Sequence, residues 1–208
     1  MNKQDYKKIE YASKETHTFK NREIVIYQLK NYKNVYISNT CHIKPKGLHI
    51  ILKNINEAIK EFDIIGEKNK IIITSHKDGF NSLGMYDAVN NEICLNEIVL
   101  DKNKLSHESI ESGHVERHEV WHLKQATIYR KKYGAINNDN YQHYLNYTNS
   151  QAKKFLDSLG VNEDNVIAIS KYAYYVFAYK NYGEVEAEIK AKKGTICILQ
   201  NSRKKSKN

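Results

Sequence analysis

Proline, cysteine and long apolar runs are all scarce in this chain of 208 residues, which contains one proline and three cysteines. No stretch approaches the roughly 20 apolar residues that a membrane-spanning helix needs. The first residues contain no apolar core run, so they do not resemble a secretory signal. No long linker and no internal repeat is visible. We therefore expect one folded domain without a membrane segment, resident in the cytoplasm.

The three cysteines are Cys41, Cys94 and Cys197. They are widely spaced and include no C-x-x-C pair, so they suggest neither a disulfide framework nor a zinc site built from thiolates. We expect them to be free thiols in a reducing compartment.

Acidic residues are absent from residues 190–208, which hold seven of the nine net positive charges of the chain. The rest of the protein is therefore nearly neutral. A basic segment can bind phosphates by releasing counterions, but a short Lys/Ser/Asn run is more typical of a solvated, disordered end. We expect an N-terminal extension over residues 1–22, a single domain over residues 23–193 and a basic tail over residues 194–208.

Hydrophobic periodicity predicts strands in the first half of the domain and helices in the second. Alternating and β-branched segments predict strands, and apolar residues at helical spacing predict helices. The expected strands are 24–28, 34–38, 69–75, 86–89 and 92–95, the last two joined by a turn at Asn90 and Asn91. The expected helices are 47–63, 114–134, 138–160, 170–182 and 183–193. This order predicts an α+β fold.

For the helix over 138–160, the expected apolar face consists of Tyr141, Leu145, Ala152, Phe155, Leu156 and Leu159.

The stretch RHEVWHLKQA, residues 117–126, contains the pattern H-E-x-x-H at His118, Glu119 and His122. Residues four apart project from one face of a helix, so the two histidines can bind one metal ion. Glu119 lies about 100° from His118, close enough to take a proton from a water that zinc has made more acidic. The spacing therefore predicts a zinc site that activates water.

A catalytic zinc site uses three protein ligands and one open position. A metzincin would place Gly and His where this chain has Gln125 and Ile128, so that class is excluded. Among the acids that follow His122, Glu184 and Glu188 lie one helical turn apart on a common face, while Glu186 points away from both. One of this pair could bind zinc while the other orients a ligand histidine. The sequence leaves open which is the ligand.

The motifs HEVWH, SKYA and EVEAE together resemble gluzincin-type zinc metallopeptidases, such as the catalytic domain of anthrax lethal factor. They are also similar to zincin-like segments of phage minor head (head morphogenesis) proteins. The resemblance covers roughly residues 70–190. It implies a zincin-like fold, in which a small mixed sheet precedes the helix of the motif.

The resemblance also implies the role of each site residue. His118, His122 and Glu184 are the implied zinc ligands, Glu119 is the implied general base, and Glu188 is implied to orient a ligand. A tyrosine near SKYA is implied to stabilise the oxyanion, and we choose Tyr172. The competing tyrosines are Tyr175, Tyr179 and Tyr182.

In zincins an edge strand lines the cleft and pairs with an extended peptide. We expect residues 91–97 to be that strand, because it is the last before the motif helix.

These observations predict a zinc metallopeptidase that binds one Zn²⁺ per chain and hydrolyses a peptide or protein substrate. An endopeptidase is favoured because no motif for capturing a peptide terminus is visible. The first alternative is a virion-associated protein that binds phage head proteins and uses the zincin fold structurally, with little or no proteolysis. The second is a nucleic-acid binder that acts through the basic tail.

Overall fold

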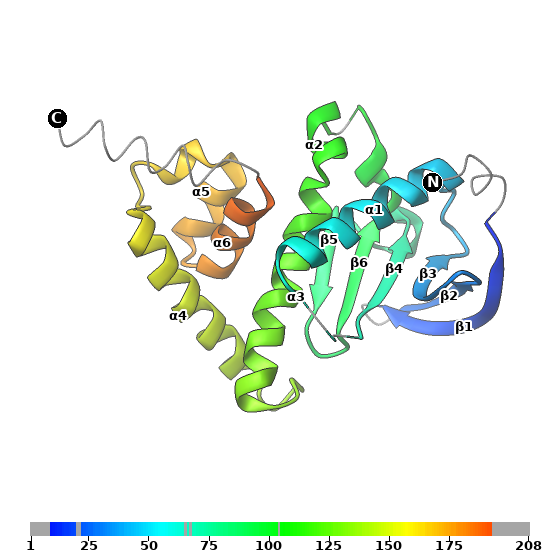
Figure 1. Ribbon diagram of the computed structural model, residues 1–208, viewed down its shortest axis with the longest axis horizontal. Coiled ribbons are helices and arrows are strands. Elements are labelled where there is room, and N and C mark those ends of the chain that lie inside the picture. The colour runs from blue at the N-terminus through cyan, green and yellow to red at the C-terminus, as the bar shows by residue number, and fades with distance from the viewer. Residues whose placement is uncertain (1–8, 20–21, 65, 67, 104, 193–208) are drawn as a thin grey trace. The chain divides into compact units, whose positions relative to one another are not determined.

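The computed structural model describes residues 9–192 except 20, 21, 65, 67 and 104 (Figure 1). The basic tail over 194–208 and Cys197 lie outside the described residues, so the predictions made for them stay predictions. The chain divides into two compact units, Met1–Val120 and Trp121–Asn208. The division falls inside one helix, α3 (His114–Tyr133).

The first unit contains a six-stranded mixed sheet with the strand order β1-β2-β3-β4-β6-β5. Its strands are β1 (Tyr11–Phe19), β2 (Arg22–Leu29), β3 (Tyr32–Ser38), β4 (Lys70–Thr74), β5 (Gly84–Asp87) and β6 (Glu92–Asn96). The pairs β1–β2, β2–β3 and β5–β6 are antiparallel, whereas β3–β4 and β4–β6 are parallel. The mixed sheet and the helices confirm the predicted α+β class.

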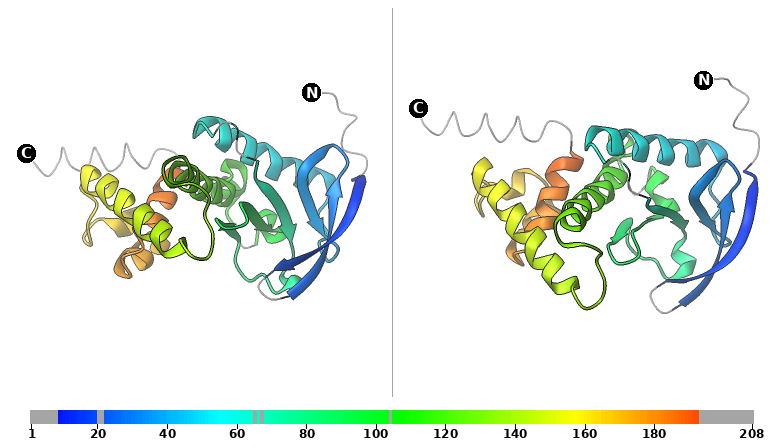
Figure 2. Two further views of the ribbon diagram at one scale, coloured as in Figure 1. Left: turned by 90° about the horizontal axis from the view of Figure 1, so that it is seen from below. Right: turned by 60° about the horizontal axis from the view of Figure 1, so that its bottom comes forward.

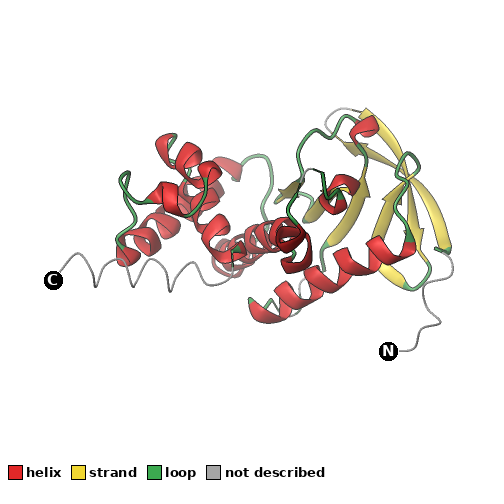
Figure 3. Cartoon of the chain, turned by 90° about the horizontal axis from the view of Figure 1, so that it is seen from above, coloured by secondary structure: helices red, strands yellow, loops and turns green. Residues whose placement is uncertain are grey.

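The central strands are buried because β4 and β6 carry apolar residues on both faces, as parallel strands do. Ile72 of β4 is paired in register with Cys94 of β6, and both belong to a buried cluster on one face that includes Phe80. Helix α1 (Pro45–Glu61) lies along a face of the sheet in the views of Figures 1 and 3. It buries Leu48, Ile51, Leu52, Ile55 and Ala58.

Two expectations about the sheet are wrong. Strand β1 lies within the region set apart as an N-terminal extension, yet it pairs with β2 from Tyr11 to Phe19. Residues 91–97 were expected to provide an exposed edge for a peptide, but β6 lies between β4 and β5. The strand that ends the sheet on this side is β5, the first strand of the predicted hairpin. Asn91 has a φ of 56° in the turn of that hairpin, a conformation that asparagine tolerates.

The second unit contains the C-terminal part of α3 followed by α4 (Tyr141–Leu159), α5 (Lys171–Ala178) and α6 (Tyr182–Ala191), drawn from further sides in Figure 2. Its core joins Leu156 of α4, Val176 of α5 and Ile189 of α6. The predicted face of α4 is partly wrong. Tyr141 and Leu145 are exposed, whereas the buried residues are Tyr144, Thr148, Ala152 and Leu156.

The helix that carries the H-E-x-x-H pattern forms as predicted. It runs without interruption to Tyr133 and is followed by Gly134 at a φ of 86°, where a side chain would be strained. Among the helices that the structure describes, none has both the length and the apolar character of a membrane-spanning segment.

Candidate metal centre

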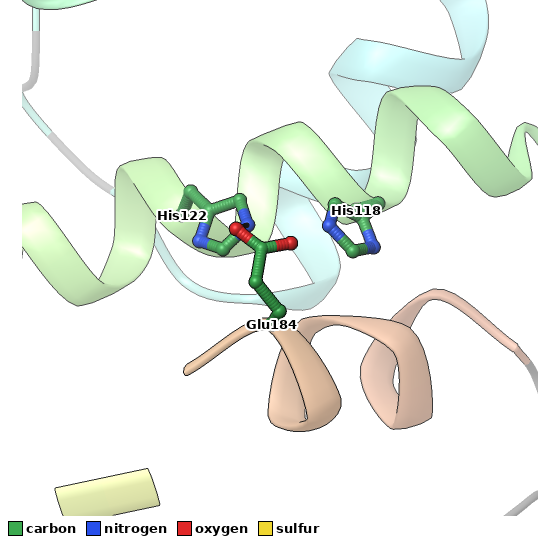
Figure 4. A group of neighbouring side chains, drawn as sticks. All are labelled: His118, His122 and Glu184. Atoms are coloured by element: carbon green, nitrogen blue, oxygen red, sulfur yellow. Dashed lines mark ion pairs between the residues drawn. The ribbon is translucent and has the colours of Figure 1, made fainter. Parts of the chain in front are cut away.

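His118, His122 and Glu184 form the group that could bind a metal ion (Figure 4). The two histidines project from the same side of α3, because they lie one turn apart, and the carboxylate of Glu184 points toward them from α6. One ligand atom from each of the three residues lies within 4.8 Å of the other two. The structure therefore brings together the three residues that the resemblance implies.

The distance between two members of this group suits a small divalent cation. His122 Nε2 lies 3.3 Å from Glu184 Oε1. Zinc bonds of about 2.0–2.1 Å in a tetrahedron separate two ligand atoms by about 3.3–3.4 Å. His118 is buried and Glu184 is half-buried, so one side of the group stays accessible. Two imidazoles and one carboxylate with an accessible side match the donor set of a catalytic zinc site.

Buried polar groups surround the start of α3, just before His118. Burial raises the pKa of Glu116 to about 7, while the Asn54 amide that donates a hydrogen bond to Oε1 opposes that shift. The guanidinium of Arg117 donates two hydrogen bonds of 2.7 Å to the carboxylate of Glu61 at the end of α1. These contacts fix the first turns of α3 to α1 within the first unit.

Glu119, the predicted general base, is buried against the start of β5. A Cβ atom at Gly84 would lie 2.6 Å from Glu119 Oε1 and 2.7 Å from its Cγ. Glycine is therefore the residue that lets the backbone of β5 approach this carboxylate. Sequence reasoning gave Gly84 no role.

Tyr172, the tyrosine chosen for the oxyanion, lies at the carboxylate of Glu184. Its hydroxyl donates a hydrogen bond of 2.8 Å to Oε2 of that residue. The competing tyrosines make other contacts. The rings of Tyr175 and Tyr179 are exposed and lie 4.9 Å apart, and the ring of Tyr182 lies edge-on to Phe177.

Glu188 is buried on α6, while the ligand group contains Glu184. Its implied role of orienting a ligand histidine stays a prediction.

Sequence reasoning missed the partner that the structure gives to His122. Gln125 Oε1 lies 2.9 Å from His122 Nδ1, and Gln125 Nε2 lies 2.9 Å from Glu186 Oε2. The three-residue spacing from His122 to Gln125 is a helical-neighbour signal that could have indicated the first contact.

Neither cysteine that the structure describes belongs to the metal group. Cys94 is buried in the sheet, and Cys41 donates a hydrogen bond of 3.3 Å to Glu97. Burial raises the pKa of both thiols, so they keep their protons at neutral pH. This agrees with the prediction that these two residues are free thiols.

Comparisons with known proteins identify no relative of this chain. No protein-family model matches the chain, and neither a curated protein nor a solved structure matches it. The site must therefore be interpreted from its own geometry.

Proposed function

We propose that this protein is a zinc-dependent peptidase, with endopeptidase action favoured. The observation that carries the proposal is the convergence of His118, His122 and Glu184, whose ligand atoms lie within 4.8 Å of one another. The pattern on α3 supplies a carboxylate, Glu119, next to the first of these ligands. A site built only to stabilise the fold would not need that carboxylate.

The donor set favours zinc over harder cations. Magnesium and calcium prefer six or more oxygen ligands, whereas two of the three donors here are imidazole nitrogens. When bound, zinc supplies a Lewis acid that polarises a carbonyl group and lowers the pKa of water. His118, His122 and Glu184 would be the residues that hold it.

The residues of the chain would divide the proton transfers and the positioning between them. Glu119 would accept a proton from the attacking water and return it to the leaving amine. Its packing against Gly84 limits the places that this carboxylate can occupy. The Tyr172 hydroxyl, at 2.8 Å from Glu184 Oε2, holds one oxygen of that carboxylate, while Oε1 faces His122.

The proposal is tested by separating metal binding from hydrolysis. Wild-type protein should contain about one zinc per chain by elemental analysis, and should cleave members of a fluorogenic peptide library. Glu119→Gln should keep the zinc and lose at least about 10³-fold in hydrolysis, because the amide cannot accept the proton. His118→Ala should lose both zinc and hydrolysis. Hydrolysis at the wild-type rate by Glu119→Gln would exclude this mechanism.

A second pair of variants identifies the carboxylate ligand. Glu184→Gln should lose zinc, while Glu188→Gln should keep it, because only Glu184 belongs to the group in the structure. Loss of zinc in Glu188→Gln alone would assign the ligand to the other carboxylate. A protein that binds zinc firmly but cleaves no peptide would instead support the structural role predicted from phage head proteins.

A further inference from the structure

Gln125 lies between a proposed zinc ligand and a second carboxylate of α6. It follows His122 by three residues on α3, and its side chain is buried. Its amide nitrogen lies 2.9 Å from Glu186 Oε2 and 3.3 Å from the carbonyl oxygen of Gly183. Its amide oxygen lies 2.9 Å from His122 Nδ1. Every polar atom of this side chain therefore has a neighbour within hydrogen-bond distance.

The two contacts to α6 determine which end of the amide faces His122. The Gly183 carbonyl oxygen can only accept, and the Gln125 amide nitrogen is also the donor to Glu186 Oε2. Only the amide NH₂ group can satisfy both, so Nε2 must face α6 and Oε1 must face the imidazole. Because Oε1 can only accept, the hydrogen of this contact must be on Nδ1 of His122.

This hydrogen determines what His122 presents to Glu184. In a neutral imidazole with its hydrogen on Nδ1, Nε2 carries a lone pair. That nitrogen lies 3.3 Å from Glu184 Oε1, which also carries lone pairs. When the ring is neutral, two such atoms at this distance repel each other unless a cation lies between them, whereas a protonated ring would form an ion pair with the carboxylate. The tautomer that Gln125 selects is therefore the one that a metal ion at this position requires.

We propose that Gln125 and Glu186 form a relay that positions His122 for zinc, an inference that rests on the proposed function. Gln125 is a positioning residue, since it touches the ligand rather than the substrate. Glu186 holds the amide in the orientation that accepts from Nδ1. The chain of hydrogen bonds also makes the imidazole a stronger donor to the metal, as carboxylates bound to ligand histidines do.

The relay also sets the separation between two ligands. Helix α6 supplies both Glu184, which faces His122, and the Gly183 and Glu186 oxygens, which accept from Gln125. A single buried amide thus fixes the α6 backbone next to Glu184 to the turn of α3 that carries His122. His122 and Glu184 are then already in place before the metal binds. This reduces the conformational entropy that the two side chains lose on binding.

Nuclear magnetic resonance of metal-free protein tests the relay directly. The two ring nitrogens of His122 are observed in protein with ¹⁵N-labelled histidine and assigned by their loss in His122→Gln. At about pH 8.5, two units above the ordinary histidine pKa of about 6.5, the wild-type ring should carry its hydrogen on Nδ1. Gln125→Met should shift the ring toward the Nε2–H form. A wild-type ring with its hydrogen on Nε2 would overturn the proposal.

Zinc affinity provides the second readout, measured by competition with a chelator. Gln125→Met and Glu186→Gln should each weaken zinc binding by about 10- to 100-fold. The double variant Gln125→Glu with Glu186→Gln reverses the relay. The new carboxylate can accept from His122 Nδ1–H, and the new amide can donate to that carboxylate. The Gly183 carbonyl loses its donor in this variant, so only part of the lost affinity should return. Affinity above that of Gln125→Met is a rescue that loss of packing alone would not produce.

The matched control is Gln142→Met, which alters an exposed glutamine on α4 that donates to Asn146. It should bind zinc like the wild type. The outcomes separate the two proposals. If wild-type protein binds no zinc, the proposed function fails while the tautomer measurement still decides the relay. If Gln125→Met binds zinc as tightly as the wild type, the relay fails while the proposed function stands.

Discussion

The carboxylate of Glu119 packs against Gly84 so closely that any side chain at that position would displace it. A Cβ atom there would lie 2.6 Å from Oε1, well inside normal contact distance. The atoms that it meets are the far end of a flexible side chain, so the backbone can stay in place while Glu119 moves. An edge-strand glycine and the proposed general base are therefore coupled by contact.

Gly84→Ala should therefore lower hydrolysis without removing zinc. A displacement of about 1 Å at a reacting group can cost about 100-fold in rate, so kcat should fall by about 10- to 100-fold. The measurements are kcat on a cleaved peptide and zinc content by elemental analysis. Equal kcat in Gly84→Ala and wild type would show that the contact with Gly84 does not position Glu119.

Tyr172→Phe distinguishes two roles for this hydroxyl. In the structure it donates to the Glu184 carboxylate, so its loss should weaken zinc binding by about tenfold, within the range for groups that bond to a ligand. A hydroxyl that stabilises the oxyanion would instead lower kcat with an unchanged zinc affinity. Chelator competition and kcat on the same variant separate the two. Tyr175→Phe is the control, because that ring is exposed and lies against Tyr179.

If Tyr172→Phe changes neither quantity, both roles are wrong. If it changes both, the hydroxyl holds Glu184 before the reaction and also stabilises the oxyanion during it.

Two residues of the candidate metal group, the histidines, could be selected from sequence because their signal is local. His118 and His122 share a helix, so helical spacing was sufficient to select them. Spacing left Glu184 and Glu188 open, and only the resemblance favoured Glu184. Gly84 and Gln125 could not be found that way. Their partners, Glu119 and Glu186, are distant in sequence and meet them only through tertiary packing.

The two wrong predictions about the sheet also arise from contacts between residues that are distant in sequence. Periodicity predicts that residues 92–95 form a strand, but it does not say which strands will be its neighbours. The parallel pairing of β6 with β4 is non-local, and it moves β6 from the expected edge to the interior. Strand β1 was missed because its residues alternate little in polarity. It forms by pairing with β2 across the turn that joins them.

Cys41 should react slowly with alkylating agents at neutral pH. Burial raises its pKa to about 12, and the negative charge of Glu97 beside it adds to that rise. The reactive thiolate is then scarce below that pH, and its fraction rises about tenfold with each pH unit toward it. At about pH 8, iodoacetamide should modify folded Cys41 at least about 100-fold more slowly than denatured protein, whose thiols have a pKa of about 8.5.

Mass spectrometry of the peptide that contains Cys41 measures this rate. Glu97→Gln should lower the pKa of the thiol and speed its alkylation at a fixed pH, because it removes the neighbouring charge. Folded Cys41 that reacts as fast as the denatured chain would contradict the prediction. Because Cys41 is not a member of the candidate metal group, Cys41→Ser should leave the zinc content unchanged.

The ion pair between Arg117 of α3 and Glu61 of α1 should stabilise the first unit more than an exposed ion pair within α1 does. The Arg117 side chain is 3% exposed, and both of its terminal nitrogens donate to the Glu61 carboxylate at 2.7 Å. Glu61→Gln replaces one acceptor with a donor next to a buried cation. The Glu61 side chain is 49% exposed, so water screens part of the pair and the variant should lower the free energy of unfolding by about 1 kcal/mol. Urea unfolding of metal-free protein measures this change.

Glu57→Gln is the matched control, because Glu57 and Lys53 form an exposed pair at 3.7 Å on α1. Exposed pairs of this spacing contribute about 0.3–0.5 kcal/mol, so this variant should unfold at nearly the wild-type urea concentration. Equal midpoints for the two variants would mean that burial adds nothing to the Arg117 pair. A larger loss in Glu61→Gln would show that the turn of α3 preceding His118 is held by α1. The positions of His118, the first proposed zinc ligand, and of Glu119 would then depend on a contact made by Glu61.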